Sequence, residues 1–309
     1  MNSQTSNRVA QGVYRIPLSI VNSYMIGPPG AGDRSWVLID AGMSFSAGTI
    51  VAEAAAIYGK DSRPAAILLT HGHFDHVGAL EMLAKRWEVP VYAHTLELPY
   101  LMGRSAYPPP DPFVGGGAMA LMSPLYSRQP INLGARVRPL PAEGVLPYLP
   151  GWKWIFTPGH SPGHVSLFRE ADRVLIAGDA FVTTKQESAL AALLKPEAIH
   201  GPPAYFTCDW DAAAASVRTL AALNPEVAAT GHGVPMSGPT MRRDLHALAA
   251  HFAEKAVPAE GRYVDHPARA DASGVTYTPP QIAPPVKTVL AGIGVAALAG
   301  FLVSKSLKA

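Results

Sequence analysis

The feature that most constrains this chain is the stretch LLTHGHFDHVGA (residues 68–79), where three histidines and an aspartate fall within six positions. An apolar run that is typical of a buried strand leads directly into it. A neutral imidazole is a good ligand for a divalent cation, and a carboxylate between two such rings adds favourable charge. The stretch therefore predicts a metal site whose first candidate ligands are His71, His73, Asp75 and His76.

Three later motifs offer the further ligands that such a site needs. The turn TPGHSPGH (157–164) contains His160, LIAGDA (175–180) puts Asp179 at the end of an apolar strand, and ATGHG (229–233) does the same for His232. The resulting five histidines and two aspartates are enough for two divalent metal ions. Zinc is the first expectation for this mixture of imidazole and carboxylate, with iron and manganese as alternatives.

Short β-type runs alternate with helical patterns along most of the chain, and no internal repeat occurs. Strands are predicted at 23–26, 36–39, 66–69, 89–93, 153–156, 164–168 and 174–177. Helices are predicted at about 47–58, 78–86, 211–223 and 241–256. This alternation indicates one catalytic domain over residues 8–256, followed by a Pro-rich linker or extension (257–286) and a C-terminal apolar helix (287–309).

The segment between 96 and 133 is irregular and too long for an ordinary connection, with prolines at 108–110 and glycines at 115–117. Such loops are usually functional or mobile. We therefore predict that the insertion 103–126 covers the mouth of the active site. Its candidates for apolar contact with a substrate are Tyr107, Phe113, Met119, Leu121 and Met122.

The C-terminal run TVLAGIGVAALAGFLVS (288–304) carries no charge and lies between lysines. As a helix it would be about 25 Å long, slightly short of a hydrocarbon core of about 30 Å, although flanking lysines can snorkel. Two structures fit this pattern: a membrane tail, or a helix docked on the domain. The Pro-rich stretch before it favours the membrane tail, so we expect membrane association through residues 288–304.

Composition limits the partners that this chain can have. The net charge is +2 and the pI is about 8.6, with Lys and Arg scattered along the chain, so nucleic acid is not an expected partner. The expected partner is a small-molecule substrate. A single cysteine excludes an intramolecular disulfide. The first residues lack the features of a secretory signal, which favours a cytoplasmic domain anchored by the tail. The oligomeric state stays open.

Taken in order, the motifs THGHFDH, TPGHSPGH, GDA and TGHG resemble those of the metallo-β-lactamase-fold hydrolases. The resemblance covers most of residues 12–256. It implies an α/β fold, a four-layer αββα sandwich of two mixed β-sheets flanked by helices, with a binuclear metal site between the sheets. It also implies two ligand sets bridged by one aspartate: His71, His73 and His160 for the first metal, Asp75, His76 and His232 for the second, and Asp179 between them.

Two residues near these motifs have other expected roles. His164 follows the ligand turn, and we expect it to pack or to hydrogen-bond a ligand without touching metal. Asp40 ends the strand VLIDAG (37–42), where the family commonly has an aspartate near the ligands. A simple strand-terminating turn explains Asp40 almost as well.

The expected function is that of a metal-dependent hydrolase in which a metal-bridging hydroxide cleaves an ester, thioester, lactone or similar bond. Asp75 would be the catalytic residue, orienting the hydroxide and passing a proton to the leaving group. The alternative is a persulfide dioxygenase that binds one iron through His71, His160 and Asp179. A third reading is a noncatalytic membrane-tethered binding module. Metal content separates the two enzymes.

Overall fold

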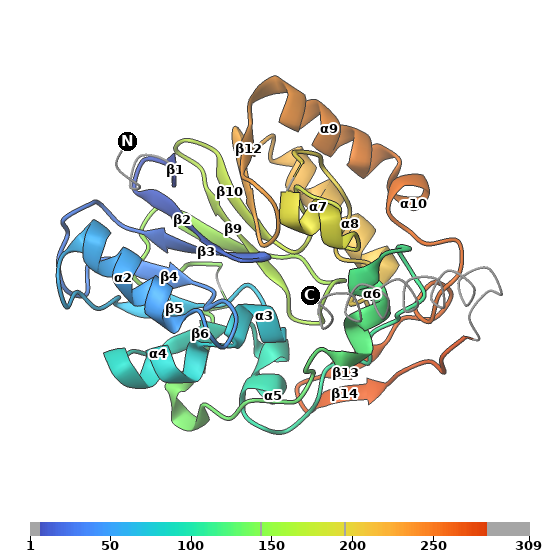
Figure 1. The fold of residues 1–309 in the computed structure, drawn as a ribbon, viewed down its shortest axis with the longest axis horizontal. Coiled ribbons are helices and arrows are strands. Elements are labelled where there is room, and N and C mark those ends of the chain that lie inside the picture. The colour runs from blue at the N-terminus through green and yellow to red at the C-terminus, as the bar shows by residue number, and fades with distance from the viewer. Residues whose placement is uncertain (1–6, 143, 195, 283–309) are drawn as a thin grey trace, which may run out of the picture.

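The computed structural model describes residues 7–142, 144–194 and 196–282. Two β-sheets face each other there, and helices cover the outer face of each sheet (Figure 1). The predicted sandwich of two mixed sheets flanked by helices is confirmed. The predicted C-terminal apolar helix, 287–309, lies outside the described residues. Among the described helices, none has the length and hydropathy needed to cross a bilayer.

The first sheet is antiparallel from β1 to β4 and parallel from β4 to β7. Its strands are β1 (Arg8–Ala10), β2 (Val13–Leu18), β3 (Val21–Ile26), β4 (Val37–Ile39), β5 (Ala66–Leu68), β6 (Val91–Ala93) and β7 (Val137–Pro139).

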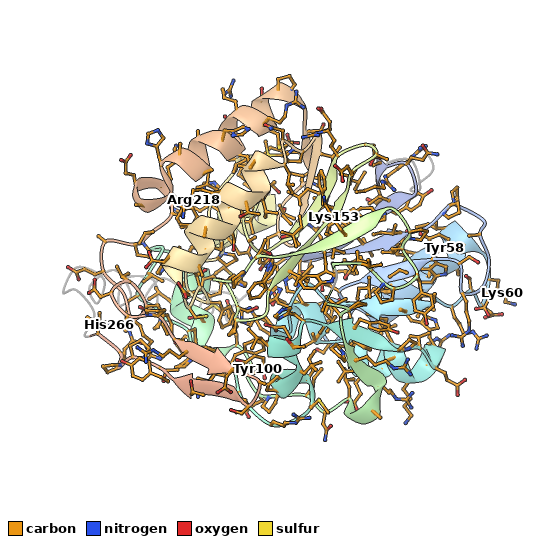
Figure 2. The ribbon with its side chains drawn as sticks, turned by 180° about the vertical axis from the view of Figure 1, so that it is seen from behind. Tyr58, Lys60, Tyr100, Lys153, Arg218 and His266 are labelled. Atoms are coloured by element: carbon orange, nitrogen blue, oxygen red, sulfur yellow. The ribbon has the colours of Figure 1, made fainter. Side chains whose placement is uncertain are left out.

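The second sheet has the spatial order β12-β11-β10-β9-β8, and only its β10–β11 pair is parallel. Its strands are β8 (Trp152–Phe156), β9 (Val165–Arg169), β10 (Val174–Gly178), β11 (Val227–Thr230) and β12 (Met236–Ser237). Figure 2, drawn from behind, labels Lys153 on the edge strand β8 and Arg218 on a helix that covers this sheet.

The helices fall into three groups along the chain. On the first half lie α2 (Ala47–Tyr58), α3 (Phe74–Val77), α4 (Leu80–Trp87), η1 (Thr95–Glu97) and α5 (Leu98–Leu101). The middle contains α6 (Ala118–Met122), η2 (Ser123–Leu125), η3 (Gly134–Arg136) and α7 (Ala189–Leu194). The second half contains α8 (Trp210–Ala222), α9 (Gly238–Ala250) and α10 (Phe252–Lys255).

The alternation of side chains along the strands builds three apolar layers. In β4, Val37 and Ile39 face the second sheet, while Leu38 faces α2 and α4. In β10, Ile176 faces the first sheet, while Leu175 packs among residues of α8 and α9. A strand whose two faces are both covered needs an uninterrupted apolar sequence, which explains runs such as VLI and VLIAG.

Several short elements were not predicted, among them β1, β2, β7 and α6, and one predicted helix is divided. Strand β2 was not among the predicted strands, and it contains Pro17, a residue that is unfavourable inside a sheet. It is tolerated because β1 pairs only with Val13 and Tyr14, so Pro17 lies beyond the end of β1. The single helix predicted at 241–256 is divided into α9 and α10 at His251, whose φ of −122° is not helical.

Residues 257–282 run back along the domain and contain a hairpin of β13 (Arg269–Asp271) and β14 (Gly274–Tyr277). The Val275 N–H donates to Ser105 Oγ at 3.0 Å, and the Ala268 N–H donates to the Cys208 carbonyl at 2.9 Å. The Tyr263 ring is buried, and its hydroxyl donates to the Pro109 carbonyl. The extension therefore contacts the insertion through several hydrogen bonds.

Candidate metal centre

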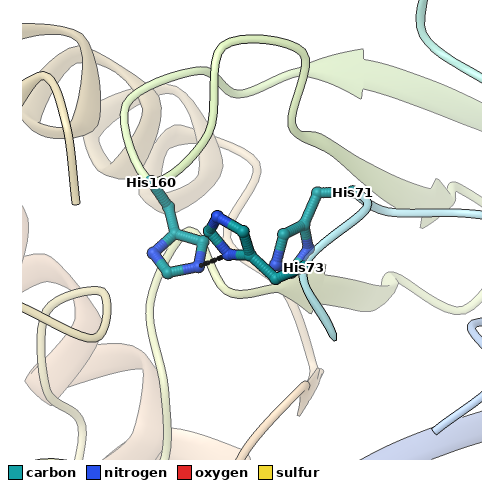
Figure 3. Close-up of side chains that lie close together, drawn as sticks. All are labelled: His71, His73 and His160. Atoms are coloured by element: carbon teal, nitrogen blue, oxygen red, sulfur yellow. Dashed lines mark hydrogen bonds between the residues drawn. The ribbon is translucent and has the colours of Figure 1, made fainter. Parts of the chain in front are cut away.

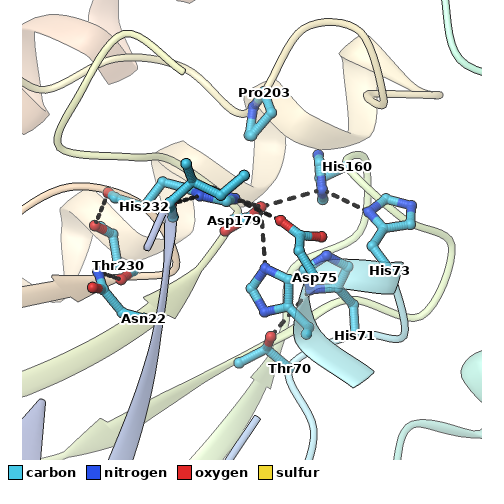
Figure 4. Close-up of polar contacts among 12 residues, drawn as sticks. Asn22, Thr70, His71, His73, Asp75, His160, Asp179, Pro203, Thr230 and His232 are labelled. Atoms are coloured by element: carbon cyan, nitrogen blue, oxygen red, sulfur yellow. Dashed lines mark hydrogen bonds and ion pairs between the residues drawn. The ribbon is translucent and has the colours of Figure 1, made fainter. Parts of the chain in front are cut away.

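The seven predicted ligands come together where four segments leave the two sheets (Figure 4). The loop after β5 carries two of them and α3 the next two, while the β8–β9 loop and the ends of β10 and β11 supply one each. All seven side chains are buried. In chain order they are His71, His73, Asp75, His76, His160, Asp179 and His232. The sequence motifs therefore converge on one site between the sheets.

Their donor atoms form three overlapping groups, within each of which the atoms lie no more than 4.8 Å apart. The groups are His71–His73–His160, His71–His76–Asp179 and Asp75–His76–His232. Figure 3 shows the first of them. Asp179 Oδ2 lies 3.5 Å from His160 Nε2 and 3.0 Å from His232 Nε2, so this carboxylate stands between the first group and the third.

Three buried donor atoms of this site have no hydrogen-bond partner among the described residues: His71 Nε2, His76 Nε2 and Asp179 Oδ1. Buried polar atoms are nearly always paired, because an unpaired one loses its hydration without compensation. Imidazole nitrogens and carboxylate oxygens are also ligands that divalent transition metals accept. The residues present therefore fit a bound cation.

Hydrogen bonds behind the site orient two of the imidazoles through Asp40. His76 Nδ1 donates to Asp40 Oδ2 at 2.9 Å, and the Thr70 hydroxyl donates to the same oxygen at 2.7 Å. Because the Thr70 hydroxyl already donates to Asp40, it accepts from His71 Nδ1 at 3.1 Å. Both rings therefore carry their proton on Nδ1 and turn a free Nε2 toward the site. This geometry agrees with the expectation that Asp40 lies near the proposed ligands.

His160 and His232 are held in the same way by other groups. His232 Nδ1 donates to the Ile20 carbonyl at 2.6 Å. The Thr207 hydroxyl donates to the Pro203 carbonyl and lies 3.4 Å from His160 Nδ1. Each of these two rings thus also presents Nε2 to the other donors, whereas His73 presents Nδ1, 3.0 Å from His160 Nε2.

His164 lies beside the site and is not one of the clustered donors. The Asp179 N–H donates to His164 Nε2 at 2.9 Å, and His164 Nδ1 donates to the Thr157 hydroxyl at 2.9 Å. Both ring nitrogens are used, so none is left for a metal. This agrees with the expectation that His164 hydrogen-bonds a ligand residue.

The ionisation of the rings divides them into two kinds. Burial and neighbouring imidazoles lower the pKa of His71 and His160 well below its ordinary value, and that of His73 to about 3. Burial is the largest single influence on His76 and His232 as well and acts against their charged form, but the carboxylates of Asp179 and Asp75, joined by Asp40 at His76, together outweigh it and raise the pKa of both rings. His71, His73 and His160 are therefore neutral at pH 7 and can offer a lone pair to a metal. His76 and His232 face carboxylates, whose negative charge would also attract a metal cation.

Aromatic side chains border the donor atoms on one side. Phe206 stacks on the His73 ring at 4.7 Å, and Phe74 stacks on Tyr126 at 5.2 Å. Phe206 lies 6.2 Å from both Phe74 and Tyr126. Burial and the charge of Asp75 raise the pKa of Tyr126, which belongs to the insertion. The insertion therefore brings an aromatic ring close to Asp75.

The five apolar insertion residues are placed differently from one another. Met119 is partly buried against the core of the second sheet, and Met122 is 49% exposed on α6. Tyr107 does not fit its predicted role: it is buried, its ring lies 4.6 Å from that of His73, and its hydroxyl donates to the carboxylate of Glu97. Sequence reasoning missed Glu97, which belongs to no motif, as well as Tyr126, Thr70 and Thr207.

Comparison with known proteins finds metallo-hydrolases among the relatives of this chain. The family model described as "Metallo-beta-lactamase superfamily" matches residues 16–232. The protein named "Probable metallo-hydrolase YflN" from Bacillus subtilis (strain 168) is 49% identical over 240 residues, which cover 78% of this chain and 90% of that protein. "Probable metallo-hydrolase YybB" from the same organism is 31% identical over 63% of this chain and 74% of its own length.

Two solved structures are also similar to this chain. The crystal structure of BLEG-1, a B3 metallo-beta-lactamase, has 27% sequence identity and a TM-score of 0.51, and the match covers 73% of this chain and 93% of that one. The metallo-beta-lactamase family protein TTHA1429 from Thermus thermophilus is similar in fold, with a TM-score of 0.53 at 24% identity over 78% of this chain and 79% of that one.

Proposed function

The chain belongs to the metallo-beta-lactamase superfamily and is a metal-dependent hydrolase of that family, and we propose that it works with two divalent cations on a small molecule. The bond cleaved would be an ester, thioester, lactone or similar bond. Zinc is the proposed metal, with iron or manganese as alternatives.

The arrangement of Asp179 is the observation that supports two cations. Its Oδ2 lies within 3.5 Å of an imidazole from the His71–His73–His160 group and 3.0 Å from one of the Asp75–His76–His232 group. Its Oδ1 is buried without a partner among the described residues. A carboxylate with one oxygen near both groups and the other unsatisfied is suited to bridging two cations.

Two divalent cations held by these groups would supply a water activated at neutral pH and would polarise the bond to be broken. The chain contributes the other parts of the reaction. Asp75 Oδ2 lies 3.4 Å from His232 Nε2, at the edge of the donor set, where its carboxylate would orient the attacking water and return a proton to the leaving group. Phe206 and Phe74 would exclude bulk water on their side of the site.

Substitution of the ligands tests this proposal. Asp179→Ala, His71→Ala and Asp75→Ala should each lower bound metal and abolish hydrolysis, because each removes a donor atom. His164→Ala should keep its metal and lose about 10- to 100-fold in activity, because it removes the acceptor of the Asp179 N–H but no donor atom of the metal site. Elemental analysis and kinetics on the same samples measure both. Full activity in Asp179→Ala would exclude a bridging role.

The substrate class is tested with a panel of lactones, thioesters, phosphodiesters and a β-lactam, the last because of the likeness to BLEG-1. We expect about two equivalents of metal and hydrolysis that consumes no oxygen. A protein with a single iron, no second metal and oxygen uptake on a persulfide would contradict the proposal and indicate a dioxygenase.

A further inference from the structure

Glu97 is a fully buried carboxylate close to the metal centre that does not itself face the donor atoms. It ends η1, directly after β6, and therefore lies beside the end of β5, where the loop to His71 and His73 begins. A buried carboxylate needs several donors to offset the loss of hydration. Its partners therefore indicate what it does.

The two oxygens of Glu97 take their hydrogen bonds from two different ligand loops. Oε2 accepts from the Gly72 N–H at 2.9 Å and from the Tyr107 hydroxyl. Oε1 accepts from the Ser161 hydroxyl at 2.9 Å and from the Gly163 N–H at 2.7 Å. Four donors satisfy both oxygens of an ionised carboxylate.

The residues that Glu97 contacts are neighbours of the proposed ligands. Gly72 lies between His71 and His73, and Ser161 follows His160. The first loop leaves the first sheet, and the second joins β8 to β9 of the second sheet. Glu97 therefore bridges the two backbones that supply the His71–His73–His160 group.

The backbone is shaped for this close approach. A Cβ on Gly163 would lie 2.7 Å from Glu97 Cγ, and one on Gly72 would lie 2.5 Å from the Tyr107 hydroxyl oxygen. Tyr107 also donates to Glu97 while accepting from the Gly72 N–H at 2.9 Å, so it closes the network on the side of the first loop. Both loops thus use glycine at the point where the carboxylate touches them.

We propose that Glu97, with Tyr107, is a positioning residue that sets the separation of the two loops and so the geometry of the His71–His73–His160 group. This inference rests on the proposed metal ligation at those histidines. Glu97 touches neither a donor atom nor the reacting bond, so it acts only through the loops.

Glu97→Gln is the variant that tests the bridge at nearly constant volume. Glutamine replaces one carboxylate oxygen with an NH2 group, which is a donor. Whichever oxygen is replaced, the backbone N–H of Gly72 or of Gly163 then faces a donor where it had an acceptor. A hydroxyl can rotate away, but a backbone N–H cannot. Metal affinity of the His71–His73–His160 group should fall about 10- to 100-fold, as for other groups that orient ligands.

The measurement is a zinc titration against a chromophoric chelator, together with the absorption spectrum of the cobalt-substituted protein and the Tm of the metal-free protein. Asp111→Asn is the matched control: Asp111 is also a buried carboxylate whose oxygens accept backbone N–H groups, those of Phe113 at 3.1 Å and Arg262 at 2.6 Å, and neither of these residues belongs to a ligand loop. It should keep the zinc affinity and cobalt spectrum of the wild type.

Tyr107→Phe is the second variant, and it covers the case in which Glu97→Gln does not fold. It should weaken zinc binding by a smaller factor, because the carboxylate keeps three donors. Tyr100→Phe is its control, since the Tyr100 ring stacks on Tyr107 at 3.8 Å but its hydroxyl has no hydrogen-bond partner among the described residues.

A Tm change without a change in zinc affinity or cobalt spectrum, in either Glu97→Gln or Tyr107→Phe, would overturn the inference and leave Glu97 a stabilising group alone. A wild-type protein that binds no metal would overturn the proposed function as well. The two failures are therefore distinguishable.

Discussion

At the scale of single residues, the site depends on groups that aim the imidazoles as much as on the imidazoles themselves. Asp40 adopts a left-handed backbone conformation, with φ of 57°, at the end of β4, and from there reaches both His76 and Thr70. Aspartate tolerates this conformation better than most residues. An interpretation of Asp40 as a plain turn is therefore incomplete, because the turn aims the carboxylate.

Gly231 gives a residue-scale prediction. A Cβ there would lie 2.0 Å from Asp179 Oδ1 and 2.8 Å from His76 Cε1, so Gly231→Ala should displace Asp179 and lower metal affinity by at least about tenfold. Metal titration of the purified variant measures this. Gly48→Ala is the control, since a Cβ at that exposed position in α2 meets nothing within 4 Å and should stabilise the helix by about 1 kcal/mol. Equal metal affinity in both variants would show that Asp179 has room to move.

At the scale of elements, the insertion has two parts with different contacts. Its first part contains Tyr107, which holds the backbone at Gly72, and its end contains Tyr126, which packs against Phe74. Deleting all of 103–126 would therefore disturb the metal loops as well as any cover over the site. A single substitution separates the two effects better than a deletion.

Tyr126→Ala should raise KM for an apolar substrate about tenfold while metal content stays the same, because the substrate loses an aromatic contact and no proposed ligand loses a hydrogen bond. Steady-state kinetics with the best substrate from the panel, beside elemental analysis, provides the check. Tyr148→Ala removes a 56% exposed tyrosine remote from the site and should change neither quantity. An unchanged KM in Tyr126→Ala would mean that this ring does not contact the substrate.

At the scale of the whole molecule, a bound metal would link the two sheets, because its proposed ligands come from both. Removing metal with a chelator should then lower Tm by about 5–10 °C, the size expected when metal is present at roughly a hundred times its Kd. Thermal unfolding with and without chelator, followed by restoration with zinc, measures it. The Asp179→Ala variant should show little response to chelator. An equal response there would place the stabilising metal elsewhere.

The predicted tail also belongs to this scale, although residues 288–304 lie outside the described part of the chain. If they insert in a bilayer, truncation after Pro285 should move the protein from the membrane fraction to the supernatant with its metal and activity intact, since no proposed ligand lies beyond His232. Fractionation of the two forms decides the matter. Full-length protein that stays in the low-salt supernatant without detergent would contradict a membrane tail.

Most of the fold and the identity of the clustered donors could be predicted from the sequence, because their signals are local. The runs VLI and VLIAG show strands covered on both faces, and His71, Asp75 and Asp179 each stand next to a strand or in a dense motif. The four sequence motifs were enough to predict which side chains would meet, and the structure brings them together.

Which nitrogen of each ring faces the site, and what holds the loops apart, depends on contacts between segments far apart in the chain. Glu97 reaches Gly72 and Gly163 from a third element, and Asp40 reaches His76 from a fourth. No periodicity or spacing marks such a contact, because hydrogen-bond partners are chosen by where folded strands end rather than by sequence distance. The sequence therefore predicts which side chains supply donor atoms to the site, whereas the orientation of these side chains is decided only when the two sheets pack.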